Sequence, residues 1–257
     1  MEDIATKLLE NVQYWFKNRF DTSETIFKLY EKIQEGIATY SEANEFAIEV
    51  GEILAESYKS QLSSDVLPDG KMYYNIAKRV IVPMMEYNYD LITNVTRQVQ
   101  KLLNDAAGIG IKPLVPELNK DRIEKIVDRV SKEDVFDDIK WMLDGPVENF
   151  CLNIVDDSVR MNAQFHAEAG LQTKVVRKLV GRGCDWCRAL AGIYSYPDDV
   201  PEDIYRRHQR CRCVVEYNPR DGKIQNVHTK KWRDENARDK IEVRKKVGLV
   251  KEEKNRR

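Results

Sequence analysis

The chain has 257 residues, 33% of them charged, and a mean hydropathy of −0.58. No stretch approaches the roughly 18 apolar residues of a membrane-spanning helix, so the composition excludes a membrane protein. The formal net charge of −1 hides an asymmetry, because residues 223–257 carry 13 Lys and Arg against 6 Asp and Glu. We therefore expect a basic C-terminal tail and an acidic remainder of the chain. The chain is long enough to bury a substantial hydrophobic core.

Apolar residues recur at helical spacing from the first residue to about residue 170. Pro83 is expected to kink or end one of these segments, because proline lacks the backbone N–H that a helix interior requires. Ser131 followed by Asp134 predicts a helix start, and Gly145-Pro146 predicts the first turn of a long helix. In chain order, the predicted helices cover residues 4–16, 26–37, 46–58, 72–83, 91–108, 119–130, 132–143 and 146–170.

The pattern changes after Gly170. Residues 173–180 are β-branched and alternate with charge, which predicts a half-exposed strand. Further strands are predicted over 193–196 and 211–217, with a hairpin turn at Asp221-Gly222 and a returning strand over 224–228. The fold class is therefore α+β: a mostly α-helical N-terminal body followed by a small zinc-stapled module that contains β-strands. We divide the chain into a helical body (1–145), the module with its leading long helix (146–222) and the basic tail (223–257), which is helical or disordered.

The most specific signal is a cluster of cysteines. Cys184-Asp-Trp-Cys187 is followed, after a 20-residue insert, by His208-Gln-Arg-Cys211-Arg-Cys213. Two residues between cysteines allow one tight turn to direct both sulfurs at the same ion. Thiolates and an imidazole in this pattern favour a tetrahedral zinc site.

Two disulfides and a redox-active CxxC pair are the alternatives to zinc. The N-terminus is acidic and amphipathic and does not resemble a secretion signal, so an oxidising compartment is not indicated. A redox pair uses neither the histidine nor the later cysteines, whereas a metal site uses them. Five candidate ligands compete for four positions, and the sequence does not decide which is left out. Four protein ligands make a structural site, while a catalytic site keeps one position open.

The alternative function is a zinc-dependent deaminase or hydrolase that uses His166 and Glu168 with Cys184 and Cys187. His166-Ala-Glu168 ahead of Cys184 and Cys187 has the outline of the zinc-dependent deaminase signature, in which the glutamate transfers protons for an attacking hydroxide. Against this alternative, Gly183 stands where that signature has proline, and the HxxCxC segment has no role. We favour the interpretation that His166 and Glu168 are surface residues at the end of a long helix, and that the chain is not an enzyme.

Basic residues crowd the cysteine segment. Together with the tail they predict non-specific contact with DNA phosphates, although such charges are more often solvated. The residues are Lys174, Arg177, Lys178, Arg182, Arg188, Arg206, Arg207, Arg210 and Arg212.

Three consecutive segments together resemble a known module. They are Val-Gly-Arg-Gly-Cys184-Asp-Trp-Cys187-Arg-Ala-Leu-Ala-Gly192, the acidic loop bounded by prolines, and Tyr-Arg-Arg-His208-Gln-Arg-Cys211-Arg-Cys213. It is the C-terminal module of phage head-morphogenesis proteins, also called minor capsid or Mu F-like proteins. The resemblance covers about residues 150–220. The helical N-terminal 150 residues match only in general character. Many members have a proline directly after the histidine, where this chain has Gln209.

This resemblance implies a low-copy virion protein without catalytic activity. It implies association with the portal protein and other capsid or scaffold components, and a role in procapsid assembly or in DNA packaging and ejection. The expected location is the capsid interior or portal vertex, and the bacterial cytoplasm during assembly. The expected cofactor is a structural zinc ion, and the basic C-terminal region is expected to contact DNA.

Overall fold

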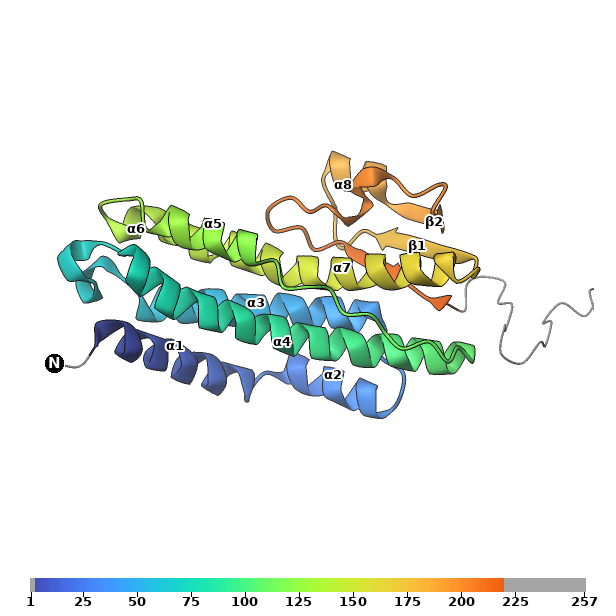
Figure 1. The fold of residues 1–257 in the computed structure, drawn as a ribbon, viewed down its shortest axis with the longest axis horizontal. Helices are drawn as coiled ribbons and strands as arrows, with labels where there is room; N and C mark the ends of the chain where they lie inside the picture. Colours follow the sequence, from blue (N-terminus) through green and yellow to red (C-terminus); the bar gives the residue numbers. More distant parts are fainter. Residues whose placement is uncertain (1–2, 220–257) are drawn as a thin grey trace, which may run out of the picture.

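A computed structural model describes residues 3–219 and confirms the predicted α+β class (Figure 1). Long helices form an N-terminal body, and a small antiparallel sheet with a cysteine cluster follows it. The predicted hairpin turn at Asp221-Gly222, the strand over 224–228 and the basic tail lie outside the described residues. In the part described, no helix is both long enough and apolar enough to cross a membrane.

The helices begin and end where local chemistry favours it. The Thr39 hydroxyl and the Glu42 carboxylate form a capping box that supplies partners for backbone N–H groups at the start of α3. Gly108 ends α4 in the left-handed conformation that glycine adopts without strain. The helices are α1 (Ile4–Phe20), α2 (Glu24–Gln34), α3 (Tyr40–Gln61), α4 (Tyr74–Ala107), α5 (Lys120–Val130), α6 (Phe136–Ile139) and α7 (Gly145–Glu168), with short 3₁₀ turns η1 (Ser64–Val66), η2 (Pro68–Gly70) and η3 (Lys140–Leu143).

Pro83 does not end a helix. Residues 74–107 form one helix, α4, with Pro83 inside it, so the two helices that we predicted over 72–83 and 91–108 are one. An interior proline costs about 3 kcal/mol. The turn on each side buries apolar side chains completely, including Ile81 and Met85, and this burial offsets the lost hydrogen bond.

The helix predicted over 132–143 is also not continuous. Ser131 caps the end of α5, and its hydroxyl donates a hydrogen bond to the Asp128 carbonyl oxygen rather than starting a new helix. Residues 136–143 then form only α6 and the short turn η3. Ile37, which we placed on a helical stripe, lies beyond α2 and is 59% exposed.

The closest helix packing is between α3 and α7, and it depends on Gly51. A Cβ atom at this position would lie 3.1 Å from the Glu148 Cα atom and 3.4 Å from the Cys151 Cβ atom. Glycine therefore allows the two backbones to approach each other. Cys151 is a buried free thiol, as its place on an apolar face predicts, and burial raises its pKa to about 12.

A three-stranded antiparallel sheet covers α7 and the adjacent end of α3 (Figure 1). The strand order is β2-β1-β3, and Val175 of the central strand pairs with Tyr194 on one side and Tyr217 on the other. One hydrophobic cluster runs from α1 through α7 into β1 and β3. The elements of this part are β1 (Thr173–Lys178), α8 (Asp185–Leu190), β2 (Gly192–Tyr196), η4 (Glu202–Tyr205) and β3 (Val214–Tyr217).

Candidate metal centre

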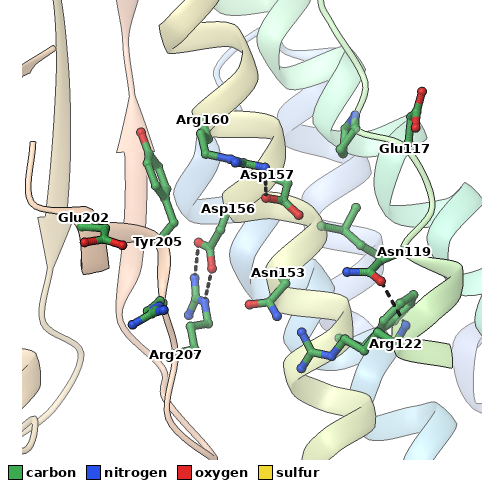
Figure 2. A pocket seen from close by; sticks show the side chains of 14 residues that line it. Glu117, Asn119, Arg122, Asn153, Asp156, Asp157, Arg160, Glu202, Tyr205 and Arg207 are labelled. Atoms are coloured by element: carbon green, nitrogen blue, oxygen red, sulfur yellow. Dashed lines mark hydrogen bonds and ion pairs between the residues drawn. The ribbon is translucent and has the colours of Figure 1, made fainter. Parts of the chain in front are cut away.

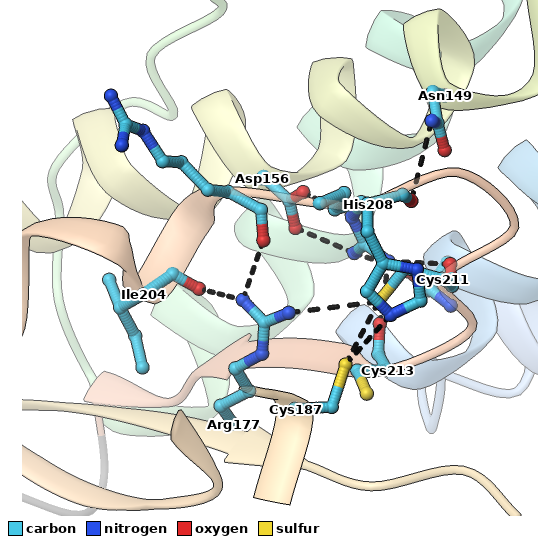
Figure 3. Close-up of polar contacts among 11 residues, drawn as sticks. Asn149, Asp156, Arg177, Cys187, Ile204, His208, Cys211 and Cys213 are labelled. Atoms are coloured by element: carbon cyan, nitrogen blue, oxygen red, sulfur yellow. Dashed lines mark hydrogen bonds and ion pairs between the residues drawn. The ribbon is translucent and has the colours of Figure 1, made fainter. Parts of the chain in front are cut away.

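The structure brings the five predicted ligand residues together beside the sheet. Figure 3 shows four of them, Cys187, His208, Cys211 and Cys213. The ligand atoms of the five residues form two groups, and within each group all atoms lie within 4.8 Å of one another. One group contains Cys184, Cys187 and His208, and the other contains Cys187, Cys211 and Cys213. Cys187 belongs to both groups, so the cluster is continuous and can hold a metal ion.

Three distances between ligand atoms can be compared with those of a tetrahedral zinc site. With Zn–S bonds of about 2.3 Å and Zn–N bonds of about 2.0 Å, neighbouring ligand atoms lie roughly 3.5 to 3.8 Å apart. The His208 Nε2 atom lies 3.4 Å from Cys184 Sγ and 3.1 Å from Cys187 Sγ. Cys187 Sγ and Cys211 Sγ are 3.7 Å apart. The Cys187–Cys211 and Cys184–His208 distances are close to the tetrahedral values and the Cys187–His208 distance is shorter, while Cys184, Cys187 and His208 form one group of close ligand atoms and Cys211 belongs to the other.

Local structure positions each ligand. Cys184 is the N-cap of α8, and the backbone N–H of Cys187 donates to its sulfur, which directs both side chains to the same side. The His208 Nδ1 atom lies 2.8 Å from the Gln209 carbonyl oxygen, an arrangement that leaves Nε2 facing the sulfurs. Cys211 and Cys213 precede β3, which begins at Val214, so our prediction that they lie within the strand is wrong.

Burial controls the chemistry of the thiols. Cys187, Cys211 and Cys213 are buried, whereas Cys184 is exposed at the surface. Burial raises the pKa of the Cys187 thiol to about 12, while the N–H groups at the start of α8 lower the pKa of Cys184. A buried thiol with a raised pKa keeps its proton at neutral pH unless a cation replaces it. The donor set and its burial thus suit a metal ion that binds thiolates.

A buried ion pair fastens the cluster to the helical body. The Arg207 guanidinium donates two hydrogen bonds to the Asp156 carboxylate of α7, and the two side chains are 1% and 2% exposed. Arg207 also donates to the backbone oxygens of Cys211 and Cys213 and to Asn44 of α3. Burial raises the pKa of Asp156 more than the neighbouring guanidinium lowers it, so the pair fixes geometry rather than adding much stability.

Sequence reasoning missed this pair and also misplaced Arg177. We assigned Arg177 and Arg207 to a basic patch, yet the Arg177 residue is 1% exposed. The signal was present, because strand alternation puts Arg177 in phase with Thr173 and Val175.

The remaining basic residues around the cluster are mostly compensated within the chain. Ion pairs join Lys178 to Glu216, Arg188 to Asp185, Arg206 to Asp203, Arg210 to Asp144, and Arg212 to Glu52 and Glu148. Lys174 and Arg182 form no ion pair within residues 3–219. Few of these charges are therefore free for contact with a phosphate backbone.

The structure does not bring His166 to the cysteines. His166 is completely buried, contrary to our surface assignment, and its Nδ1 atom lies 2.6 Å from the Tyr217 hydroxyl oxygen. Neither group of close ligand atoms found among the described residues includes it. Burial lowers its pKa to about 4, so the ring is neutral at pH 7.

A cavity of about 530 Å³ lies between the connector before α5, the middle of α7 and η4 (Figure 2). The Arg207–Asp156 pair lies at its wall, and next to it Arg160 donates to Asp157 at 2.8 Å. Each charged group of α7 on this side is therefore paired within the chain, Arg160 with Asp157 and Asp156 with Arg207.

Comparison of the chain with known protein families, curated proteins and solved structures finds no match. The resemblance to the Mu F-like module accordingly rests on the motif residues themselves.

The Arg207–Asp156 pair yields a first prediction. Asp156→Asn keeps the shape of the side chain but leaves the buried guanidinium without a counter-charge, so we expect the free energy of unfolding to fall by about 3–5 kcal/mol. The neighbouring Asp157→Asn, which breaks a half-exposed pair, is expected to cost about 1 kcal/mol or less. Urea denaturation measures both values, and equal effects of the two substitutions would contradict a structural role for the buried pair.

His166 yields a prediction for pH. The folded protein holds its pKa at about 4, while the unfolded chain has the ordinary value of 6.5. As the pH falls from 6.5 towards 4, the unfolded state takes up a proton that the folded state does not, and the free energy of unfolding falls. We expect His166→Gln to lose less stability than the wild type between pH 7 and pH 5 in zinc-containing buffer. Parallel pH curves for the two proteins would show that His166 does not contribute.

Proposed function

We propose that this chain is a minor capsid or head-morphogenesis protein of a tailed phage or prophage, and that it contains a structural zinc ion. The observation that carries the proposal is the motif shared with the Mu F-like module, whose cysteines and histidine form one cluster here. The proposed partners are the portal protein and other capsid or scaffold components, and the proposed site of action is the portal vertex or capsid interior.

The zinc assignment follows from the donor chemistry. Sulfur and imidazole ligands at tetrahedral spacing are typical of zinc, and oxygen-binding ions such as magnesium do not favour them. Each group of close ligand atoms supplies three ligands, and the two groups share Cys187, so in our proposal the fourth ligand of a structural site comes from the other group. When bound, the zinc would hold α8, the loop before β3 and the 20-residue insert between them together without a large core.

The proposed role in assembly agrees with the shape of the molecule. α4 alone, at 34 residues, is about 50 Å long, so the helical body offers long faces to a larger ring or shell. The sheet and α8, which carry the metal site, lie on one side of this body (Figure 1). DNA contact is assigned to the basic tail, because most basic residues near the cluster are already paired.

Loss of a central ligand tests the zinc site. Cys187→Ser removes a thiol that belongs to both ligand groups, so we expect the purified protein to lose its zinc and to become protease-sensitive around residues 180–215. Elemental analysis and limited proteolysis measure these changes, while far-UV circular dichroism follows the helices. The control is Cys151→Ala, which removes a buried thiol outside the cluster and should keep the metal. Wild-type protein that is free of metal yet fully protease-resistant there would contradict the proposal.

Deletion in the phage or prophage that encodes the chain tests the assembly role. We expect purified wild-type particles to contain the chain at low copy number, and deletion particles to have reduced infectivity or abnormal DNA content. Complementation with Cys151→Ala should restore infectivity, whereas Cys187→Ser should not. Deletion particles that are fully infectious with normal DNA content would refute the head-morphogenesis assignment.

A further inference from the structure

We infer that Arg177 is the buried counter-ion of the metal–thiolate centre and a positioning residue for its ligands. This inference rests on the proposed zinc site. It assigns a role to a side chain that the sequence pattern alone places in a solvated basic patch.

Arg177 enters the interior from the central strand β1. Its Nη2 atom donates to Cys211 Sγ at 3.7 Å, and its Nη1 atom donates to the backbone oxygens of Ile204 and Arg206 (Figure 3). The guanidinium also lies 5.1 Å from the centre of the Trp186 ring, within the CxxC segment. One side chain thus touches both halves of the ligand cluster and the insert between them.

Within residues 3–219, no carboxylate pairs with the charge of Arg177. An arginine side chain stays protonated in proteins, and a buried charge without a partner is strongly unfavourable. Arg177 forms no ion pair with any acid that the structure describes. Asp156 is close enough to feel its charge, but both carboxylate oxygens of Asp156 accept hydrogen bonds from Arg207.

Thiolates supply the missing negative charge. A divalent ion with three thiolates and a neutral imidazole carries a net charge of −1, and with four thiolates it carries −2. Either centre attracts a guanidinium, and three thiolates with His208 balance Arg177 completely. Hydrogen bonds to metal-bound sulfur are the outer contacts that orient ligands, and their loss typically weakens metal binding about 10–100-fold.

Trp186 adds to this arrangement. Its ring meets the His208 ring edge-on, with centroids 6.0 Å apart, while its face contacts Arg177. The cation–π contact holds the guanidinium in place beside the sulfurs. The indole therefore links the counter-ion to the histidine on the exposed side of the cluster.

Substitutions of Arg177 can separate the effect of its charge on zinc affinity from the effect of its shape. Arg177→Gln keeps hydrogen-bond donors but removes the charge, and Arg177→Lys keeps the charge. We expect Arg177→Gln to weaken zinc binding about 10–100-fold in competition with a chelating dye, and Arg177→Lys to recover most of the loss. The matched control is Lys174→Gln, which removes an exposed positive charge from the same strand and should leave the affinity unchanged.

Cobalt substitution supplies a spectroscopic measurement. Removal of a cation beside the sulfurs should shift the thiolate-to-cobalt charge-transfer band in Arg177→Gln but not in Lys174→Gln. Should Arg177→Gln fail to fold by circular dichroism, Arg177→Met takes its place as the neutral variant. A packing role predicts that Met is tolerated better than Lys, whereas the counter-ion role predicts the opposite order.

The outcomes distinguish this inference from the proposed function. Wild-type protein that binds no zinc overturns the zinc site and the inference together. Wild-type protein that binds zinc, with equal affinity in Arg177→Gln and Lys174→Gln, overturns the role of Arg177 alone.

Discussion

The buried pair between Arg207 and Asp156 is the contact on which the arrangement of the C-terminal part depends. Arg207 precedes the ligand His208 directly, and it holds the backbone of both later cysteines while it binds α7. The cysteine loop is therefore fixed to the helical body by the same side chain that shapes it. A buried ion pair adds little net stability, but few alternative geometries satisfy both of its charges, and this gives the docking its specificity.

Two buried arginines with different partners explain how the cluster fits against an apolar core. Arg207 is neutralised by a carboxylate of the body, whereas Arg177 donates to a cysteine sulfur and to backbone oxygens. A protein interior does not tolerate an uncompensated charge of either sign. The charge of Arg207 is thus balanced by Asp156 of α7. In our proposal, the charge of Arg177 is balanced by the thiolates that bind the metal ion.

The distribution of surface charge bears on the proposed role. Ion pairs within the chain engage most basic side chains around the cluster, so this face is not a continuous positive patch. The excess of Lys and Arg over Asp and Glu in the sequence lies in residues 223–257. In our proposal, residues 3–219 dock on protein partners and residues 223–257 contact DNA, which separates the two functions along the chain.

The sequence alone predicted much of the fold and the composition of the candidate site. Helical periodicity identified the long helices, and the CxxC and HxxCxC spacing identified all five residues of the cluster, because both signals are local. Local signals failed at Pro83, where burial of neighbouring side chains lets the helix continue, and at residues 132–143, where Ser131 ends α5 and only the short elements α6 and η3 follow.

Only the tertiary structure decided which charged residues are buried. In sequence, Arg207 and Asp156 resemble their solvated neighbours, and His166 resembles a residue at a helix end; for Arg177, strand alternation indicates the inward face but not the partner. Their burial follows from the packing of the sheet on α7, which brings together residues that lie 34 to 51 positions apart in the sequence. The periodicity of a sequence indicates which residues share one face of a helix or strand. It does not indicate which groups lie on the element packed against that face, and a charged side chain can be buried only where such a group is its partner.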